Sequence, residues 1–330
     1  MKTTFKPRTR RNAGFDNFLC ASAENTNLNA LNLDLAASGF SLRNAVALAQ
    51  ASAAAYDGAS IQNELCHVRF LPQEDCLVVA FRGTHNLQDI MVDAEAGRIP
   101  LPGMAGSVHA GFWKSVESIV GQLVEVLQTP GNEPDLPLFI TGHSKGGAEA
   151  MLAACILSRK LQPARIEGVY TFDQPRLFDA GARASYDRQA VDGPPLGAVT
   201  WRIVNGGDIV PQVPFWHWGY RHAGNEAFLP DCGSAVSDCG LLVNPRWDVT
   251  VVSKLNAYIA AFRRHKDVCI TDHFITEIQA RLEQEEAIRS AESEVRSVEK
   301  CRVIKSTAPA TLPAKSKTQD QRPGTLDPNI

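Results

Sequence analysis

The 330-residue sequence predicts an α/β fold, in which helices cover both faces of a mostly parallel central sheet. Two observations carry this prediction. Short apolar runs, typical of buried strands, alternate along the chain with longer stretches whose apolar residues keep helical spacing. Several of these runs also end in glycine and polar residues, which is where sheets of this kind bind ligands. A hydrophobic content of 44% is enough for a sizeable core.

The sequence divides into a central domain with an extension at each end. Residues 1–40 are rich in Asn, Ala and Ser and have weak periodicity, so we expect a poorly ordered leader. We expect the domain itself over residues 41–278. Residues 279–304 predict a charged helix. Its apolar residues keep heptad spacing over too few residues for a coiled coil. Residues 305–330 have almost no large apolar side chains and are expected to be disordered.

The first half of the domain is expected to contain a helix, a strand pair and a second helix. Apolar residues from Leu42 to Ala53 keep helical spacing after Ser41, a suitable N-cap. The strand-like runs His67–Leu71 and Cys76–Phe81 follow, and the second is apolar almost throughout, as in a central strand. A wide apolar stripe then predicts one long helix over residues 108–128.

Residues 136–151 contain a strand, a sharp turn and the start of a helix. The apolar run Leu138–Thr141 leads at once into Gly-His-Ser-Lys-Gly at residues 142–146, and Ala148–Lys160 is helix-forming. The pattern G-x-S-x-G between a strand and a helix is the nucleophile elbow of α/β-hydrolases. Its glycines leave room for a strained turn, and the helix N-terminus favours negative charge beside the serine. The pattern predicts that Ser144 is a nucleophile.

Two further apolar strands are expected beyond the elbow helix. Residues 166–172 form the first, which ends in Asp173, and residues 198–204 form the second, which Asp208 follows closely. The alternation of strands with helices is that of parallel strands joined by crossovers. Both aspartates are therefore expected at the carboxyl edge of the sheet, where the elbow also lies.

A serine nucleophile needs a base to take its proton and a buried acid to orient that base. In this fold the chain order is serine, acid, histidine. Asp208 and Asp173 are both candidates for the acid, and the glycines before Asp208 place it better, because they let the chain turn back toward the serine. His222 and His273 are both candidates for the base, whereas His265 belongs to a basic cluster that we expect to be exposed.

The strand expected over residues 76–81 ends in Arg82-Gly83-Thr84. A glycine and a hydroxyl residue at the exit of a buried strand suit an anion site built from backbone N–H groups, although an ordinary strand exit fits them equally well. The next stretch has apolar residues at helical spacing, which suits either a surface helix or a short lid over the site. These apolar residues are Leu87, Ile90 and Met91.

Charge, composition and cysteine usage argue against several classes of protein. The net charge of −3, with scattered basic residues, argues against a nucleic-acid partner. No apolar stretch approaches the ~20 residues that span a bilayer, and no signal-peptide pattern follows the basic N-terminus. We therefore expect a cytoplasmic protein, with export by a non-standard route left open. No Cys/His cluster has zinc spacing, so we expect neither a metal nor a cofactor. Nothing indicates a protein partner, and Cys232 and Cys239 would pair only in an oxidising compartment.

The chain from about Val46 to Ile278 resembles the class 3 (fungal-type) lipase family, a branch of the α/β-hydrolases. The matching segments follow one another in the family's order, and this ordered set is far more specific than any one segment. The segments are Ala47–Tyr56, Phe81–Thr84, Val108–Phe112, Thr141–Ala148, Thr171–Arg176, Asn205–Pro214, Tyr220–Glu226 and Asp272-His273.

The resemblance chooses among the candidates that the residues alone left open. It implies that Ser144 is the nucleophile, that Asp208 is the acid and that His273 is the base. The family's His-x-Gly-x-Glu element is structural, which implies that His222 takes no part in the chemistry. The base and the acid would then act as in other serine hydrolases, through an acyl-enzyme.

The resemblance also implies an oxyanion hole and a lid. Thr84 and the backbone N–H of Lys145 would hold the oxyanion, and the segment after Thr84 would be the lid. The sequence departs from the family at two positions, since the family usually has leucine where Lys145 stands and glycine where Asp173 stands. Our hypothesis is that Lys145 leans toward Asp173 or toward an anionic group of the substrate.

The function that the resemblance implies is that of a serine ester hydrolase acting on acylglycerols or phospholipids. An apolar lid would then make transient contact with a lipid surface. Two alternatives remain at this point: a soluble carboxylesterase for small esters, and a non-catalytic scaffold or interaction protein that keeps the fold.

Overall fold

The structure is a computed structural model, and it describes residues 28, 30–84, 97–129, 136–161, 165–190, 193–206, 208–230, 241–243 and 275–307. The side chains of the last helix are described as far as Glu294. The chain divides into two compact units, Met1–Glu286 and Ala287–Ile330. Within the described residues, no helix is long and apolar enough to cross a membrane.

The strands of the first unit form one large sheet and one small sheet. The large sheet contains β1 (Ile61–Gln62), β2 (His67–Pro72), β3 (Leu77–Phe81), β6 (Leu138–His143), β7 (Ile166–Phe172), β8 (Thr200–Asn205), β9 (Asn225–Leu229) and β10 (Leu242–Val243). The small sheet pairs β4 (Arg98–Pro100) with β5 (Ser107–His109). The order across the large sheet is β1-β2-β3-β6-β7-β8-β9-β10.

The centre of the large sheet is parallel, from β3 through β6, β7 and β8 to β9. The edge strands β1, β2 and β10 are antiparallel to their neighbours. Every residue of β3, β6 and β8 is buried, as expected of strands that are covered on both faces. The predicted α/β-hydrolase fold with a mostly parallel sheet is confirmed.

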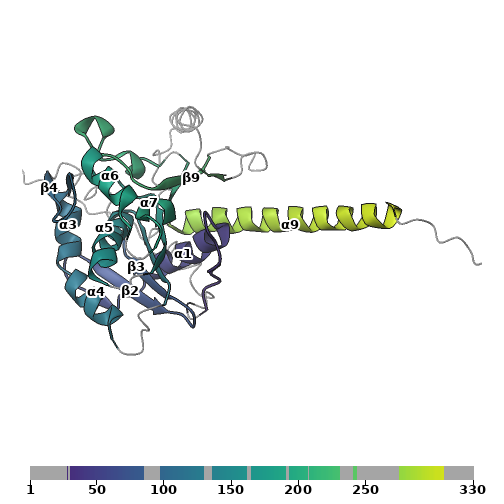
Figure 1. The fold of residues 1–330 in the computed structure, drawn as a ribbon, viewed down its shortest axis with the longest axis horizontal. Coiled ribbons are helices and arrows are strands. Elements are labelled where there is room, and N and C mark those ends of the chain that lie inside the picture. The colour runs from purple at the N-terminus through teal and green to yellow at the C-terminus, as the bar shows by residue number, and fades with distance from the viewer. Residues whose placement is uncertain are drawn as a thin grey trace, which may run out of the picture. The chain divides into compact units, whose positions relative to one another are not determined.

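Helices cover both faces of this sheet (Figure 1). They are α1 (Leu42–Ala54), α3 (Ala110–Glu117), α4 (Val120–Leu127), α5 (Lys145–Lys160), α6 (Ala180–Arg188), α7 (Leu196–Val199) and α9 (Ile275–Thr307), with 3-10 turns η1 (Val210–Gln212) and η2 (Trp216–Trp218). Residues of α3, α4 and α5 share one core cluster with Val79 and Ile140, while α1 and the first turns of α9 share the other with Val78 and Phe139. Neighbouring residues of β3 thus face opposite layers, as the pleat requires.

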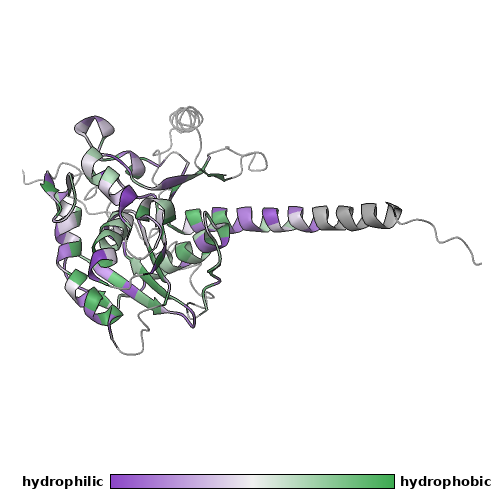
Figure 2. Cartoon of the chain, in the orientation of Figure 1, coloured by the Kyte–Doolittle hydropathy of each residue, from purple (hydrophilic) through white to green (hydrophobic). Residues whose placement is uncertain are grey.

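The long helix predicted over residues 108–128 is interrupted, so this prediction is wrong in detail. Ser107–His109 is strand β5, and the helix that follows stops at Ser118. The hydroxyl of Ser118 donates to the carbonyl of Ser115 (2.6 Å), and α4 begins after this turn. The buried apolar face continues across the break, which is why the sequence shows an uninterrupted stripe. Figure 2 shows polar and apolar residues on different sides of α4.

Residues 279–304, expected as a separate charged helix, lie within the longer helix α9. The first turns of α9 belong to the core, because Ile278 and Leu282 are fully buried. Residues 1–27 and 308–330 lie outside the described residues. The division of the chain proposed from the sequence therefore stays a prediction.

Candidate active site

Ser144 lies in the sharp turn between β6 and α5, with backbone angles φ 58° and ψ −129°. The glycines on either side are required sterically. A Cβ on Gly142 would lie 2.3 Å from the carbonyl oxygen of Gly146, and one on Gly146 would lie 2.2 Å from that of Phe81. The G-x-S-x-G pattern therefore exists because two glycine backbones pass close to other backbones while the serine holds a strained conformation.

The hydroxyl of Ser144 is buried, and within the part of the chain that the structure describes it has no hydrogen-bond partner. Ser144 occupies the N-cap position of α5, yet its side chain does not cap the helix. Its backbone N–H donates to Phe172 of the neighbouring β7 (2.8 Å), so the turn is fixed by the backbone. A buried hydroxyl without a hydrogen bond costs about 1–3 kcal/mol of stability. Such an unsatisfied group is typical of a catalytic residue.

Asp208 follows β8 and is almost completely buried. Its Oδ1 accepts a hydrogen bond from the N–H of Val210 (2.9 Å), and its own N–H donates to the carbonyl of Asn205 (3.1 Å). These bonds form a tight turn that leads into η1. Because β6, β7 and β8 are parallel neighbours, this turn and the elbow at Ser144 lie at the same edge of the sheet.

Asp173 ends β7 at this edge, and its backbone is also left-handed, with φ 46°. Glycine adopts this conformation without strain, whereas a residue with a side chain does so only at a cost. The carboxylate compensates, since its Oδ1 accepts a hydrogen bond from the N–H of Asn205 (2.7 Å). The guanidinium of Arg281 in α9 donates to the side-chain oxygen of the same Asn205. Asp173 and Arg281 thus hold the end of β8, which leads to the Asp208 turn.

The other predicted site residues fall into two groups. His222 is described, and its Nε2 donates to the carbonyl of Pro211 (2.8 Å), at the foot of η1. The predicted base His273 lies outside the described residues. The predicted lid residues and the two cysteines considered for a disulfide also lie outside them: Leu87, Ile90, Met91, Cys232 and Cys239.

Thr84 stands one residue beyond a glycine that touches the elbow. A Cβ on Gly83 would lie 2.2 Å from the hydroxyl of Tyr56, 2.6 Å from the carbonyl oxygen of His143 and 3.2 Å from Cβ of Ser144. No side chain fits at Gly83 without moving the elbow. The chain end that carries Thr84 is therefore packed directly against the turn that carries Ser144.

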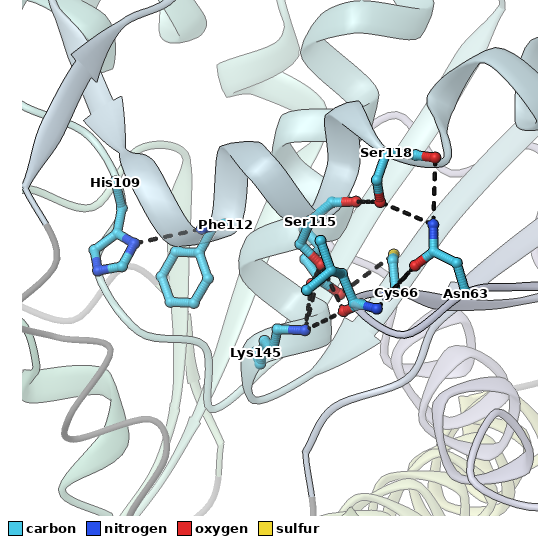
Figure 3. A network of polar contacts seen from close by, with 9 residues as sticks. Asn63, Cys66, His109, Phe112, Ser115, Ser118 and Lys145 are labelled. Carbon is cyan, nitrogen blue, oxygen red and sulfur yellow. Dashed lines mark hydrogen bonds and ion pairs between the residues drawn. The ribbon is translucent and has the colours of Figure 1, made fainter.

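Lys145, the first residue of α5, turns its ammonium group to a buried carboxylate one helical turn later (Figure 3). Its Nζ lies 2.9 Å from Oε1 of Glu149 and donates to the carbonyl of Leu65 (2.6 Å) and the hydroxyl of Ser115 (3.3 Å). The hypothesis that Lys145 leans toward Asp173 or toward the substrate is wrong, because the ammonium is already bound by these acceptors.

Glu149 was missed in the sequence, although its i,i+4 spacing from Lys145 is the usual spacing of a helical ion pair. Its side chain is fully buried, and it accepts hydrogen bonds from the hydroxyl of Ser115 and the thiol of Cys66 (3.8 Å). Burial raises the pKa of Glu149, while the Lys145 ammonium acts in the opposite direction. The ion pair ties α5 to α3 and to the chain segment before β2 (Figure 3).

Across the described ranges, no group of three or more His, Cys, Asp or Glu residues could hold a metal ion. The polar groups gathered at the carboxyl edge of the sheet are instead a buried hydroxyl, two buried carboxylates and the N-terminus of α5. Within this set, the hydroxyl of Ser144 can act as a nucleophile, and the N-terminus of α5 favours negative charge beside it.

A family model described as Lipase (class 3) matches residues 78–218. A lipase of Rhizomucor miehei is 32% identical over 162 residues, which are 48% of this chain and 43% of that protein. A "Secreted mono- and diacylglycerol lipase 2" of Gibberella zeae is 31% identical over 181 residues, which are 47% of this chain and 44% of that protein. The chain thus spans less than half the length of these curated relatives.

Two solved structures also align with part of this chain. A structure of Rhizomucor miehei triacylglyceride lipase aligns with a TM-score of 0.44 at 29% identity, covering 50% of this chain and 62% of that chain. Lipase II from Rhizopus niveus aligns with a TM-score of 0.49 at 24% identity, covering 64% of this chain and 76% of that chain.

The cytoplasmic location expected from the sequence is wrong. A relative from Gibberella zeae is named a secreted lipase, and this finding contradicts the expectation. The expectation rested on the absence of a signal-peptide pattern, and an absence of that kind carries no physical information about where a chain is delivered.

The region matched by the family model contains the strand end at Thr84, the elbow at Ser144 and the turn at Asp208. It ends before His273, whose role stays a prediction. Through residues 78–218, this chain is similar to the class 3 lipase family.

Proposed function

We propose that this chain is a serine ester hydrolase. The observation that carries the proposal is the state of Ser144: its backbone is held at φ 58° at the N-terminus of α5, and its buried hydroxyl has no partner among the described residues. The match of residues 78–218 to the class 3 lipases supports the same activity.

The reaction proceeds in two halves. His273, oriented by Asp208, takes the proton of Ser144 as the serine oxygen attacks the ester carbonyl carbon. The tetrahedral intermediate expels the alcohol, which receives that proton from His273, and an acyl-enzyme remains. Water then gives a proton to His273 and attacks the acyl carbon. Collapse of the second intermediate releases the carboxylic acid and returns the proton to Ser144.

The oxyanion of each intermediate is held by two donors, the backbone N–H of Lys145 and Thr84. The N–H of Lys145 is at the N-terminus of α5, where the helix dipole favours negative charge. Loss of one such donor costs about 2.7–4 kcal/mol of transition-state stabilisation. The side-chain charge of Lys145 takes no part, because Glu149 neutralises it.

The relatives' names supply the class of substrate. One of them is a secreted mono- and diacylglycerol lipase, so acylglycerols are the first substrate that we propose, and phospholipids the second. An extracellular site of action is proposed on the same ground. We propose further that Leu87, Ile90 and Met91 form the apolar face of a lid, which contacts the lipid surface transiently. The reaction requires no cofactor.

The test is to measure hydrolysis of short-chain and long-chain p-nitrophenyl esters and of an emulsified triacylglycerol. Ser144→Ala should abolish turnover of all three, whereas Ser158→Ala, a change at another buried serine of α5, should retain it. Turnover that survives Ser144→Ala, or no turnover by the wild type, would overturn the proposal and leave a non-catalytic scaffold. Activity confined to the short soluble ester would instead identify a small-ester carboxylesterase.

A further inference from the structure

Tyr56 lies just after α1, and its hydroxyl reaches the residue that precedes the nucleophile. The phenol oxygen is 2.8 Å from Nδ1 of His143, and the two ring centroids are 6.0 Å apart. The mechanism proposed above assigns no task to either side chain. Both side chains nevertheless lie next to the proposed nucleophile, since His143 is the last residue of β6 and Ser144 follows it.

The same hydroxyl also touches the chain that carries Thr84. A Cβ on Gly83 would lie 2.2 Å from the Tyr56 oxygen, and the backbone of Gly83 is a hydrogen-bond partner of that oxygen. One hydroxyl therefore contacts the residue before Thr84 and the residue before Ser144. These are the two chain segments that supply the proposed oxyanion donors.

The hydrogen-bond roles within this trio follow from the chemistry of a phenol. Burial raises the pKa of Tyr56 above its ordinary value, so the group keeps its proton. The oxygen accepts from the N–H of Gly83, and in the His143 tautomer that carries its proton on Nε2 the phenol proton is donated to Nδ1. The guanidinium of Arg82 lies 5.9 Å from the centre of the ring, which holds the ring from the β3 side.

The sheet alone does not fix the spacing of these two segments. The ladder between β3 and β6 ends at the pair Phe81 and Gly142. Beyond it, the N–H of Arg82 donates to His67 of β2 (3.0 Å), and the N–H of Ser144 donates to Phe172 of β7 (2.8 Å). The two chain ends therefore turn toward different neighbours. Tyr56 bridges them at the level where the ladder has stopped.

We propose that Tyr56 is a positioning residue. It sets the distance between the two segments that form the oxyanion hole, the one that carries Thr84 and the one that carries Ser144 and Lys145. This inference rests on the proposed esterase function. The hydroxyl does not touch the reacting atoms. It keeps two donors at the separation that a developing oxyanion requires, and this separation matters most in the transition state.

The first experiment compares Tyr56→Phe with the wild type on a soluble ester. The variant keeps the ring and loses the hydroxyl, so kcat should fall about ten- to a hundredfold, less than for removal of a whole donor, while KM changes less than about twofold. The matched control is Tyr170→Phe, which removes another tyrosine hydroxyl, one that accepts from the N–H of Ser41 (3.1 Å) away from the elbow. The control should keep the wild-type kcat.

A second readout is the rate at which a p-nitrophenyl phosphonate modifies Ser144. Its transition state places charge in the same oxyanion hole, so Tyr56→Phe should slow this rate in proportion to kcat. In a Thr84→Ala background, removal of the Tyr56 hydroxyl should lower kcat little further, because the segment that Tyr56 positions has already lost the side chain of Thr84.

The partner residue supplies a test that does not depend on the folding of Tyr56→Phe. In His143→Asn, the side-chain oxygen takes the place of Nδ1 and still accepts from Tyr56, whereas in His143→Leu nothing accepts. His143→Asn should therefore retain several times more kcat than His143→Leu.

Three outcomes would overturn the inference in an active wild type: unchanged kcat in Tyr56→Phe, an equal fall in Tyr170→Phe, or a rise in KM at constant kcat. Equal kcat in His143→Asn and His143→Leu would overturn it as well. A wild type without Ser144-dependent turnover would be a different failure, that of the proposed function, and this inference would fall with it.

Discussion

At the scale of single residues, strain is concentrated at two strand ends. Ser144 and Asp173 are the non-glycine residues with positive φ in the described part of the chain, and they follow neighbouring parallel strands. A left-handed backbone costs about 1–2 kcal/mol for a residue with a side chain. At Asp173 the bond from Asn205 to the carboxylate offsets this cost (2.7 Å). At Ser144 the side chain makes no such hydrogen bond within the described residues, which is the pattern of a functional site.

The first prediction concerns the balance at Asp173. Asp173→Ala should lower the free energy of unfolding by about 1–3 kcal/mol, because the N–H of Asn205 loses a buried acceptor while the backbone stays strained. Asp173→Gly should be about 1 kcal/mol less destabilising than Asp173→Ala, since glycine removes the strain. Urea unfolding of both variants measures the difference. An alanine variant as stable as the glycine variant would show that the backbone strain is negligible.

At the scale of elements, the Lys145–Glu149 pair joins three parts of the fold behind the elbow (Figure 3). A lysine at the N-terminus of a helix opposes the helix dipole, and a buried carboxylate loses its hydration. Each group is therefore unfavourable alone and is tolerated because of the other. The pair is also saturated, as Ser115 and Leu65 complete its hydrogen bonds. This explains how a cation can replace an apolar residue beside the nucleophile.

The second prediction is that Lys145→Leu destabilises the protein by about 3–5 kcal/mol at neutral pH, because it leaves the Glu149 carboxylate buried without its cation. The double variant Lys145→Leu with Glu149→Leu should recover most of this loss, since no charge remains buried. The free energy of unfolding in urea measures both. A single variant as stable as the double variant would show that the carboxylate needs no cation.

The third prediction concerns the pH dependence of that loss. Burial raises the pKa of Glu149 above its ordinary value of 4.5 in the folded protein. A protonated Glu149 therefore stabilises the folded protein. This stabilisation is fully present below the ordinary pKa and is lost as the pH rises through the pKa that Glu149 has in the folded protein. Removing the Lys145 cation raises that pKa further. The stability gap between the wild type and Lys145→Leu should therefore be small near pH 4.5 and widen toward pH 8. Thermal unfolding across this range measures it, and a constant gap would contradict the assignment.

At the scale of the first unit, the site lies at the carboxyl edge of a sheet whose two faces are covered by different helices. The second face is completed by α9, through residues far along the chain. Ile275, Ile278 and Leu282 are buried, and Arg281 bonds to the end of β8. The helix therefore contributes to the core before Glu286, where the first unit ends.

The fourth prediction separates the two parts of α9. A chain that ends after Glu286 should keep the thermal midpoint of the full chain within about 2 °C, because the buried residues among the described side chains of α9 all precede that position. Leu282→Ala in the full chain should instead cost about 2–5 kcal/mol, as for other buried leucines. Differential scanning calorimetry compares the two. A large loss on truncation would show that residues beyond Glu286 stabilise the first unit.

The sequence allowed the fold and the elbow to be predicted, because both have local signatures. The strands are continuous apolar runs, and G-x-S-x-G between a strand and a helix is legible without any partner residue. The break at Ser118 was not predictable, since the apolar face continues across it. The Lys145 ion pair has a local signature in the i,i+4 spacing to Glu149, but this spacing does not indicate that the carboxylate is buried and therefore holds the ammonium.

Other features had no local signature at all. The contact of Tyr56 with His143 joins residues that are 87 positions apart, and neither residue type indicates such a contact in the sequence. The roles of His273 and of the lid residues Leu87, Ile90 and Met91 stay predictions, since they lie outside the described residues. The location was wrong because it was inferred from a missing pattern, and the name of a relative overturned it.

The bond from Arg281 to Asn205 has a consequence for the order of events during synthesis. These residues are 76 positions apart, and Asn205 stands where β8 leads into the turn of Asp208. The nucleophile elbow can form once β6, α5 and β7 have left the ribosome, because the residues that it contacts, among them Tyr56, Gly83 and Phe172, have all emerged by then. The acid-bearing turn gains its last support only after residue 281 has emerged. A nascent chain therefore contains Ser144 long before Arg281 can hold the strand end that leads to Asp208. We expect that the chain cannot hydrolyse esters until the first turns of α9 have joined the core.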